Sequence, residues 1–277
     1  PEDLWSWLEK TSAETNARFT AIPHNSNISK GYMFSGNSLR GKPFSKDYVA
    51  LRSKWERIAE ITQIKGDSET HSKFSPEDAF ADFEIYPYYI QRRWTEYNPQ
   101  RGDFVREALK QGLEMEANLG QNPYRLGVIG STDSHTALSS AEEDNFHGKL
   151  ATDSIPANKT SNFNDDGPGS SGWAMSASGM AAVWAESNTR SDIMDALERR
   201  EVYATTGPRI AVQFYGGPDF TEADLENADL HTLATARGVP MGGELHQTET
   251  PTFLVLATKD PEGANLDRIQ MVKGWLD

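Results

Sequence analysis

The sequence predicts an α/β fold over its first two hundred residues, followed by a β-rich segment. In the first part, short apolar runs rich in β-branched residues alternate with stretches whose apolar residues recur at helical spacing. This alternation is typical of βαβ units with parallel strands. After Gly216 the helical spacing fades and strand-like segments separated by Gly and Pro turns predominate. We therefore expect two units, an α/β unit at 1–207 and a β-rich accessory domain at 208–277.

Capping residues and apolar spacing predict the helices. Pro1 precedes two acidic residues, Ser75 precedes Pro76, and Thr189 precedes Asp192 by three residues, and each pattern is typical of a helix N-terminus. Gly120 is typical of a residue that ends a helix. The expected helices are 1–18, 45–58, 79–85, 103–119 and 189–200.

The strands are predicted from short apolar or alternating runs bounded by turn residues. They are expected at 19–22, 59–64, 126–129, 180–185, 202–205, 209–214, 252–257 and 268–272. Between the third and fourth of these, residues 136–179 form a long stretch rich in Ser, Gly, Asn and Asp. A loop of that length in a compact domain is often functional or mobile.

The composition excludes several classes of function. With 277 residues and a formal net charge of −14, neither nucleic acid nor an anionic membrane is expected as the main partner. There are no cysteines, which excludes disulfides, thiolate zinc sites and a cysteine nucleophile but leaves the compartment open. No apolar window is long enough to cross a bilayer. The chain starts at Pro1 without an initiator Met or signal peptide and ends in a strand-like run, so we expect a piece of a larger protein.

Three predicted strands are each followed at once by polar side chains. His24 follows the first, the loop from Lys65 to His71 follows the second, and Asp133 and His135 follow the third. Taken singly, each has an ordinary explanation: His24 bonded in a tight turn, a solvated loop around Asp67, or Asp133 as a cap with His135 as a plain loop residue. Chemistry is commonly carried at the carboxyl ends of strands in α/β folds, so we expect these groups to converge if the strands are neighbours.

Two histidines and an aspartate make a plausible site for zinc, manganese or iron. His24, Asp133 and His135 are therefore the predicted metal ligands. A bound metal ion would lower the pKa of water and polarise a phosphoryl or carbonyl oxygen. Lys65 could orient an anionic small-molecule substrate, and Glu69 or His71 could act as general acid or base. No Walker loop, dinucleotide fingerprint or Gly-x-Ser-x-Gly elbow is present.

Four longer motifs in order resemble the DUF3604 family, an uncharacterised group similar to the PHP (polymerase and histidinol phosphatase) metal-dependent hydrolases. The motifs are IPHNSN (22–27), EITQIKGDSETH (60–71), GVIGSTDSH (127–135) and YATTGPRI (203–210), and DPEGANL (260–266) extends the resemblance into the tail. The PHP resemblance implies the carboxyl-terminal half of a distorted (β/α)7 barrel with two or three metal ions at its carboxyl face. By the same resemblance His24 is a ligand from the middle of the set, and Asp133 and His135 are the closing Asp-x-His pair.

The sequence departs from the PHP pattern, because the opening His-x-His, the Asp-His pair after it and the bridging Glu are absent. The resemblance places them in an amino-terminal half, so three ligands of about nine remain and the isolated piece is expected to bind metal weakly or not at all. The leading interpretation is a portion of a metal-dependent hydrolase of phosphoesters, with amide or lactone hydrolysis not separable from it. The alternative is a non-catalytic binding or scaffold protein with a degenerate barrel and a ligand-binding β-domain. Substrate, metal identity, oligomeric state and localisation stay open.

Overall fold

The computed structural model describes residues 1–277 except 92, 138–139, 146–147, 159–174, 176–177 and 247–249. Within the described part the chain is mixed α/β, with five α-helices and eight strands. The helices are α1 (Glu2–Thr15), α2 (Lys46–Trp55), α3 (Val105–Leu119), α4 (Arg190–Arg199) and α5 (Leu230–Arg237). The strands are β1 (Ile58–Gln63), β2 (Gly66–Asp67), β3 (Gly127–Gly130), β4 (Met180–Val183), β5 (Val202–Thr205), β6 (Ala211–Gly217), β7 (Val239–Pro240) and β8 (Thr252–Thr258).

The sheet that carries the site is β2-β1-β3. β1 pairs antiparallel with β2 through a tight turn and parallel with β3, and α3 lies in the connection between the two parallel strands. The β1–β3 register shifts once: Glu60 pairs with Ile129 but Thr62 pairs with Gly130, so Ile61 is an extra residue in β1. Because β1 and β3 run in parallel, their carboxyl ends lie at the same edge of the sheet.

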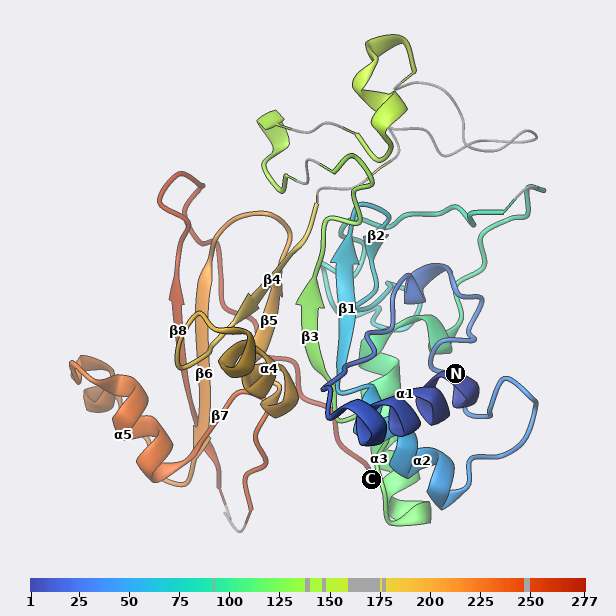
Figure 1. The fold of residues 1–277 in the computed structure, drawn as a ribbon. Helices are drawn as coiled ribbons and strands as arrows, with labels where there is room; N and C mark the ends of the chain where they lie inside the picture. The colour runs from blue at the N-terminus through green and yellow to red at the C-terminus, as the bar shows by residue number, and fades with distance from the viewer. Residues whose placement is uncertain (92, 138–139, 146–147, 159–174, 176–177, 247–249) are drawn as a thin grey trace.

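The antiparallel pair β4-β5 lies directly against β3 (Figure 1). The amide of Gly179 donates to the carbonyl of Ser131 at 2.9 Å. A Cβ at Gly130 would stand 2.7 Å from the carbonyl oxygen of Met180 and 2.9 Å from that of Thr205. Only glycine permits so close an approach, so Gly130 allows β4 and β5 to pack across the end of β3.

Helices α2 and α3 cover one face of the β1–β3 pair. Val105 and Ala108 of α3 and Val49 of α2 join Ala59 and Tyr124 in one buried apolar cluster. Inside it lies a buried cation: the Nε of Arg52 is 2.9 Å from the carboxylate of Glu56, and its guanidinium donates to the Tyr124 hydroxyl at 3.0 Å and to the Met33 carbonyl at 2.7 Å. The two terminal nitrogens of Arg52 are thereby hydrogen-bonded, whereas Nε is compensated only by the charge of Glu56.

The C-terminal part forms a second layer of structure. β6 lies between β7 and β8 in an antiparallel sheet, and α5 packs on it through Leu230 and Ala234, which contact Tyr215 and Leu254 in a separate buried cluster. Figure 1 shows this sheet on one side of β4-β5 and α1, α2 and α3 on the other. The two parts are joined by the indole of Trp184, which donates to the Val212 carbonyl at 2.8 Å. The predicted division into 1–207 and 208–277 stays a prediction.

Most predicted elements coincide with observed ones within a few residues, but three expectations are wrong. Residues 19–22 are not a strand; the Ala21 amide donates to Trp55 and the Pro23 carbonyl accepts from Glu60, and the ladder goes no further because Pro23 has no N–H. Residues 79–85 form successive turns rather than a helix, since the Asp78 carboxylate accepts from the Phe80 amide and is paired with Arg106.

The third error lies in the C-terminal part. Residues 268–272 are extended and exposed, and in the described part of the chain they pair with no strand. The C-terminal part also contains a helix that the sequence did not predict, α5, which Asp229 caps by accepting from the Thr232 amide.

The described strands lie in three small sheets, and the seven-stranded barrel stays a prediction. Much of the predicted 136–179 loop falls outside the described residues; its described portion includes the short 3-10 segments Glu143–Asn145, Ala151–Ser154 and Pro156–Asn158. Among the helices that the structure describes, none is both long and apolar enough to cross a membrane.

Candidate functional site

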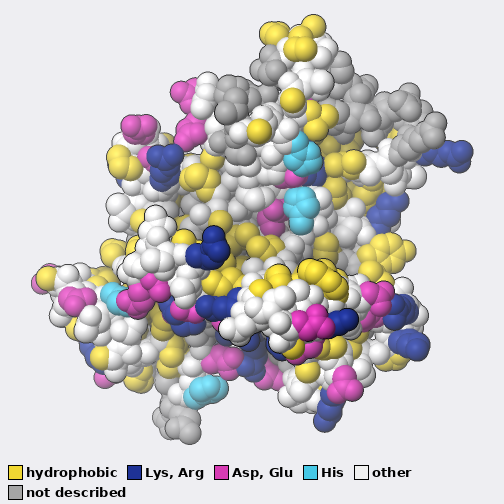
Figure 2. Space-filling view, viewed as in Figure 1, with side chains coloured by type: hydrophobic (Ala, Val, Ile, Leu, Met, Phe, Trp, Pro, Cys, Tyr) yellow, Lys and Arg dark blue, Asp and Glu magenta, His cyan; other side chains and the backbone are white. Residues whose placement is uncertain are grey.

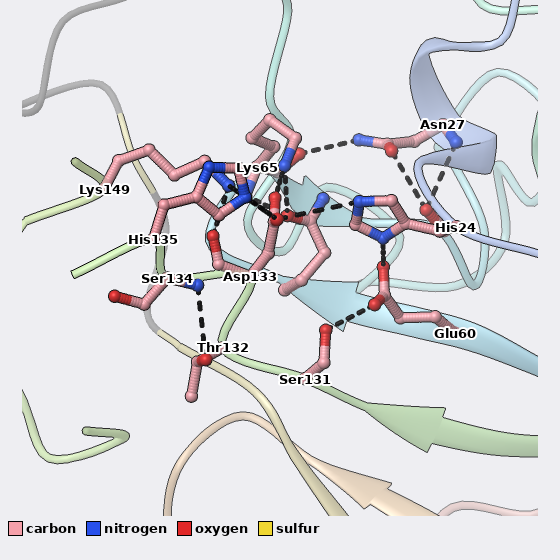
Figure 3. A network of polar contacts seen from close by, with 12 residues as sticks. His24, Asn27, Glu60, Lys65, Ser131, Thr132, Asp133, Ser134, His135 and Lys149 are labelled. Carbon is pink, nitrogen blue, oxygen red and sulfur yellow. Dashed lines mark hydrogen bonds and ion pairs between the residues drawn. The ribbon is translucent and has the colours of Figure 1, made fainter. Parts of the chain in front are cut away.

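Six ionisable side chains from separate segments meet beside the carboxyl ends of β1 and β3 (Figure 3). We call this group the Asp133 cluster, and its members are His24, Glu60, Lys65, Asp133, His135 and Lys149. Glu60 lies on β1 and Lys65 in the β1–β2 turn, whereas Asp133 and His135 follow β3. The parallel pairing of β1 and β3 is what brings these segments together.

Asp133 is the centre of the cluster. Its φ of 49° lies in the left-handed region, which Asp and Asn adopt more readily than most other residues. The Oδ1 atom lies 3.2 Å from His135 Nε2, 3.7 Å from His24 Nε2 and 2.6 Å from Lys149 Nζ, while Oδ2 is paired with Lys65. The carboxylate is buried, but the side chains of His24 and His135 are 42% and 61% exposed. Solutes can therefore reach the cluster from the histidine side.

Figure 2 shows the same open side: histidine and acidic side chains gather on the face of the molecule above helix α1. The exposed imidazoles thus stand at the surface with a buried carboxylate behind them. This arrangement is typical of a polar binding site, where a few placed polar groups fix a ligand.

The ring of His24 is held in one orientation by Glu60. His24 Nδ1 lies 2.8 Å from Glu60 Oε1, and Glu60 Oε2 accepts a hydrogen bond from the Ser131 hydroxyl. Since a carboxylate only accepts, the short contact assigns the proton to Nδ1. The other ring nitrogen, Nε2, then faces the Asp133 carboxylate.

Two lysines supply the positive charge of the cluster. Lys65 Nζ donates to Gln63 Oε1 at 3.0 Å and pairs with Asp133; burial, together with the positive charge of Lys149, lowers the pKa of Lys65 to about 7. Lys149 Nζ lies 3.2 Å from His135 Nε2 and donates to the Asp133 carbonyl. Burial lowers the pKa of Lys149, and the charge of Lys149 in turn lowers the pKa of His135.

The turn that carries Lys65 is braced by Asn27. Asn27 Nδ2 donates to the Lys65 carbonyl at 2.8 Å, and Asn27 Oδ1 accepts from the Ser68 hydroxyl at 3.0 Å. Asn27 is fully buried, and its backbone N–H donates to Ser68 Oγ at 3.2 Å. The segment after His24 is thereby fastened to the end of β1, which fixes the distance between His24 and the lysine.

The family model described as "Protein of unknown function (DUF3604)" matches residues 1–277. The chain belongs to the DUF3604 family. The family resemblance seen in the sequence is thus confirmed, while similarity to the PHP hydrolases stays a proposal. No curated protein and no solved structure matches the chain.

Two pairs of donor atoms in this DUF3604 chain have roughly the spacing of ligands on one metal ion. Two ligands that each lie about 2.1 Å from one tetrahedral ion stand roughly 3.4 Å apart. Asp133 Oδ1 lies 3.2 Å from His135 Nε2 and 3.7 Å from His24 Nε2, so one distance is slightly shorter than that value and the other slightly longer. In the residues that the structure describes, however, no group of three or more His, Asp or Glu side chains is arranged to hold a metal ion as it stands. The ammonium of Lys149 lies against two of these donors, at 2.6 and 3.2 Å.

The predicted site residues are only partly brought together. His24, Lys65, Asp133 and His135 meet in the Asp133 cluster. Glu69 lies elsewhere, paired with Arg106 at 2.6 Å.

His71 is also apart from the cluster. Its Nδ1 accepts from the Lys73 amide at 3.0 Å, and its ring packs on Phe74, Tyr97 and Phe104. The acid–base roles predicted for Glu69 and His71 therefore gain no support from their positions.

Sequence reasoning missed three members of the site, Glu60, Ser131 and Lys149. For Glu60 a signal existed: it is the one charged residue within a strand whose neighbours are apolar or uncharged. Ser131 lies in the sequence Gly-Ser-Thr (130–132) at the end of β3. No local sequence pattern marks Lys149. A backbone hydrogen bond places it at the cluster, since the His135 amide donates to the Lys149 carbonyl at 2.8 Å.

Proposed function

We propose that this DUF3604 chain forms part of a divalent-metal-dependent hydrolase that acts on phosphoesters. The observation that carries the proposal is the orientation of His24. Glu60 fixes the ring so that Nε2 faces the Asp133 carboxylate at 3.7 Å. In the neutral ring Nε2 is an acceptor, as is the carboxylate oxygen, so a cation that reaches both atoms can bind both.

The pairing of Glu60 with His24 is also the arrangement found behind metal-bound histidines. A ligating imidazole usually donates its other ring N–H to a carboxylate, which fixes the tautomer and increases the basicity of the ligand. Under the proposal Glu60 is this supporting carboxylate, and His24, Asp133 and His135 hold the ion. Nitrogen and oxygen donors in this ratio suit zinc, manganese or iron.

A bound ion of this kind lowers the pKa of water and polarises a phosphoryl oxygen. The protein side chains have separate tasks. Lys65, buried and fixed by Gln63, balances the charge of Asp133 and contributes positive potential next to the donors. Positive potential in a partly buried site attracts an anionic small molecule such as a phosphoester.

The similarity of the sequence motifs to PHP hydrolases supports the same chemistry, because His24 and the pair Asp133 and His135 match ligand positions of that superfamily. The proposal includes the barrel fold and the two or three metal ions that this similarity implies. The competing function is a binding or scaffold role without catalysis.

Metal binding by the 277-residue chain tests the proposal. Titration calorimetry with Mn²⁺ and with Zn²⁺ is expected to show weak binding to the unaltered chain, which carries three of the ligands that the resemblance implies, and at least tenfold weaker binding to Asp133→Asn and His135→Gln. Asn is chosen at 133 because it tolerates the left-handed backbone. His246→Gln is the control, since His246 is exposed and outside the cluster.

Hydrolysis of p-nitrophenyl phosphate and bis-p-nitrophenyl phosphate with the same metals gives the second readout. Equal metal affinity in all four proteins would contradict the proposed ligand set. Metal binding without hydrolysis of either ester would favour the binding or scaffold role.

A further inference from the structure

A cavity lies apart from the Asp133 cluster. Its volume is about 470 Å³, within the range of roughly 300–1,000 Å³ that is usual for small-molecule sites. Its walls come from β1, β2, the first turn of α3, β5 and the start of β6, together with turns at 78–83. None of the six members of the Asp133 cluster lines it, so the cavity is a candidate binding site in its own right.

Negative charge exceeds positive charge in the walls of this cavity. Among the described residues that line it are the carboxylates of Asp67, Glu69 and Asp78, whereas the one cation is Arg106. The guanidinium of Arg106 is already shared between two of these carboxylates, at 2.6 Å from Glu69 and 2.7 Å from Asp78. Within the described part of the chain, the Asp67 carboxylate is therefore left without a basic side chain of its own.

Asp67 is held by backbone amides instead. One carboxylate oxygen accepts from the Glu69 amide at 2.7 Å, and the other accepts from the Thr70 amide at 3.4 Å. Burial raises the pKa of Asp67 to about 7, because two amide hydrogen bonds do not offset the loss of water around the charge. A cation that enters the cavity would stabilise the ionised carboxylate by direct attraction.

Thr62 contributes a polar group with no partner. It lies in the wall of the cavity and is 4% exposed, and its hydroxyl has no hydrogen-bond partner among the residues that the structure describes. A buried hydroxyl without a partner is unfavourable, since it has lost its bonds to water. A ligand that brings an N–H group to this hydroxyl would restore the missing bond.

The cavity also offers aromatic rings. Phe80 and Phe83 line it with 43% and 51% of their surface exposed. The guanidinium of Arg268 lies 3.6 Å from the centroid of the Phe80 ring, so this ring already takes a cation from its own chain. Cations are attracted to the faces of aromatic rings in general.

We propose that this cavity binds a small organic cation, an alkylammonium of the diamine class. An ammonium is a compact charge with three donors, which suits the Asp67 carboxylate and the Thr62 hydroxyl. The methylene groups of such a ligand would pack on the apolar part of the lining, Ile61, Ile210 and Val212. The proposal goes beyond the proposed hydrolase activity and does not rest on it.

A metal ion suits this cavity less well than an ammonium. Hard divalent ions take several carboxylate or carbonyl oxygens at once. The Glu69 and Asp78 carboxylates are bound to Arg106, and Asp78 also accepts from Gln270 at 3.1 Å. One free carboxylate, one hydroxyl and two aromatic rings are a better match for an organic cation.

Titration calorimetry of the 277-residue chain with putrescine tests the proposal. Butanediol, which has the same carbon chain without charge, is the matched control ligand and is expected to bind at least tenfold more weakly. Asp67→Asn removes the charge but keeps the oxygen that accepts from Glu69, and it is expected to weaken putrescine binding at least tenfold. Asp47→Asn, at an exposed position on α2, is expected to bind putrescine within twofold of the unaltered chain.

Thr62→Val provides a second test because it keeps the shape of the side chain and removes the hydroxyl. The midpoint of thermal unfolding, followed by circular dichroism, is expected not to fall, since the lost hydroxyl has no partner in the described part of the chain. Putrescine binding is nevertheless expected to weaken at least threefold. Thr232→Val, at an exposed position on α5, is the control and should change the affinity by less than twofold.

The proposal is overturned if putrescine does not bind or binds no more tightly than butanediol. It is also overturned if Asp67→Asn and Thr62→Val, both folded, bind putrescine within twofold of the unaltered chain. Binding of maltose in preference to putrescine would assign the cavity to neutral sugars instead. Metal binding at the Asp133 cluster is measured separately, so either proposal can fail without the other.

Discussion

Glu60→Gln is the substitution that most directly probes how the site is built. Glutamine has the shape of glutamate, so its amide oxygen can still accept from His24 Nδ1 and its amide nitrogen can donate to the Ser131 hydroxyl. In the unaltered chain these two contacts are a 2.8 Å hydrogen bond from His24 and one from Ser131. What the variant removes is the negative charge behind the imidazole.

The expected loss of Mn²⁺ affinity follows from the removal of that charge. A hydrogen bond to a charged group contributes about 1.5–3 kcal/mol and a neutral one about 0.5–1.5 kcal/mol, so the loss at His24 is about 1–2 kcal/mol. Since 1.4 kcal/mol is tenfold in affinity, we expect Mn²⁺ binding to weaken by roughly five- to thirtyfold. Supporting carboxylates of metal-bound histidines have effects of about 10–100-fold, which agrees with this range.

Titration calorimetry measures the Mn²⁺ affinity, and the ¹⁵N chemical shifts of the His24 ring report its tautomer. The predicted result is weakened binding with the Nδ1-protonated tautomer retained. Glu60→Ala should weaken Mn²⁺ binding further than Glu60→Gln does, because it leaves Ser131 and His24 without their acceptor. Glu9→Gln, at an exposed pair with Lys54, is the matched control. A folded Glu60→Gln that binds Mn²⁺ within twofold of the unaltered chain would refute the reasoning.

Three further predictions concern stability. Burial raises the pKa of Asp67 from 3.8 to about 7, so its contribution to the free energy of unfolding is fully present below about pH 3.8 and is lost as the pH rises to about 7. Since one pKa unit corresponds to about 1.4 kcal/mol, Asp67→Asn should gain roughly 4 kcal/mol over the unaltered chain at pH 8 and almost nothing at about pH 3, by urea unfolding. Gly130→Ala places a Cβ 2.7 Å from the Met180 carbonyl and should cost roughly 1–3 kcal/mol in the same assay. Arg52→Met leaves the buried Glu56 carboxylate unpaired and should cost roughly 3–5 kcal/mol.

Each of these has a control in the chain. Gly274→Ala should leave the free energy of unfolding unchanged, because a Cβ there meets no atom within 4 Å. Lys54→Met breaks an exposed pair with Glu9 and should cost about 1 kcal/mol or less. Equal losses for Arg52→Met and Lys54→Met would contradict the role of burial, and an Asp67→Asn gain that does not depend on pH would contradict the raised pKa.

Much of the site could be predicted because it follows from parallel strands. Residues after the carboxyl ends of neighbouring strands meet at one edge, and this brings Lys65, Asp133 and His135 together. Local signals also placed helix ends: Thr189 accepts from the Asp192 amide, and Gly120 takes a φ of 73°.

The other site residues and helix α5 depend on contacts between distant segments, which no local sequence pattern predicts. Glu60 sits in an alternating strand, where a charged residue is typical of the solvent side, and only the partners His24 and Ser131 make its burial favourable. Helix α5 was missed because its eight residues have little amphipathic pattern of their own; it is stabilised by burying Leu230 and Ala234 on the sheet. Lys149 reaches Asp133 from sixteen residues away.

The extra residue in β1 means that the length of this strand is as much a part of the site as its composition. Ile61 stands between Glu60 and Thr62, which pair with consecutive residues of β3. Deleting it would keep every polar side chain of the cluster in the sequence. Thr62 would then follow Glu60 directly and could still pair with Gly130, so the deletion would remove the bulge together with the local bend and added twist that a bulge gives a strand. The direction in which β1 delivers Lys65 toward Asp133 therefore depends on the bulge as well as on the residues of the cluster.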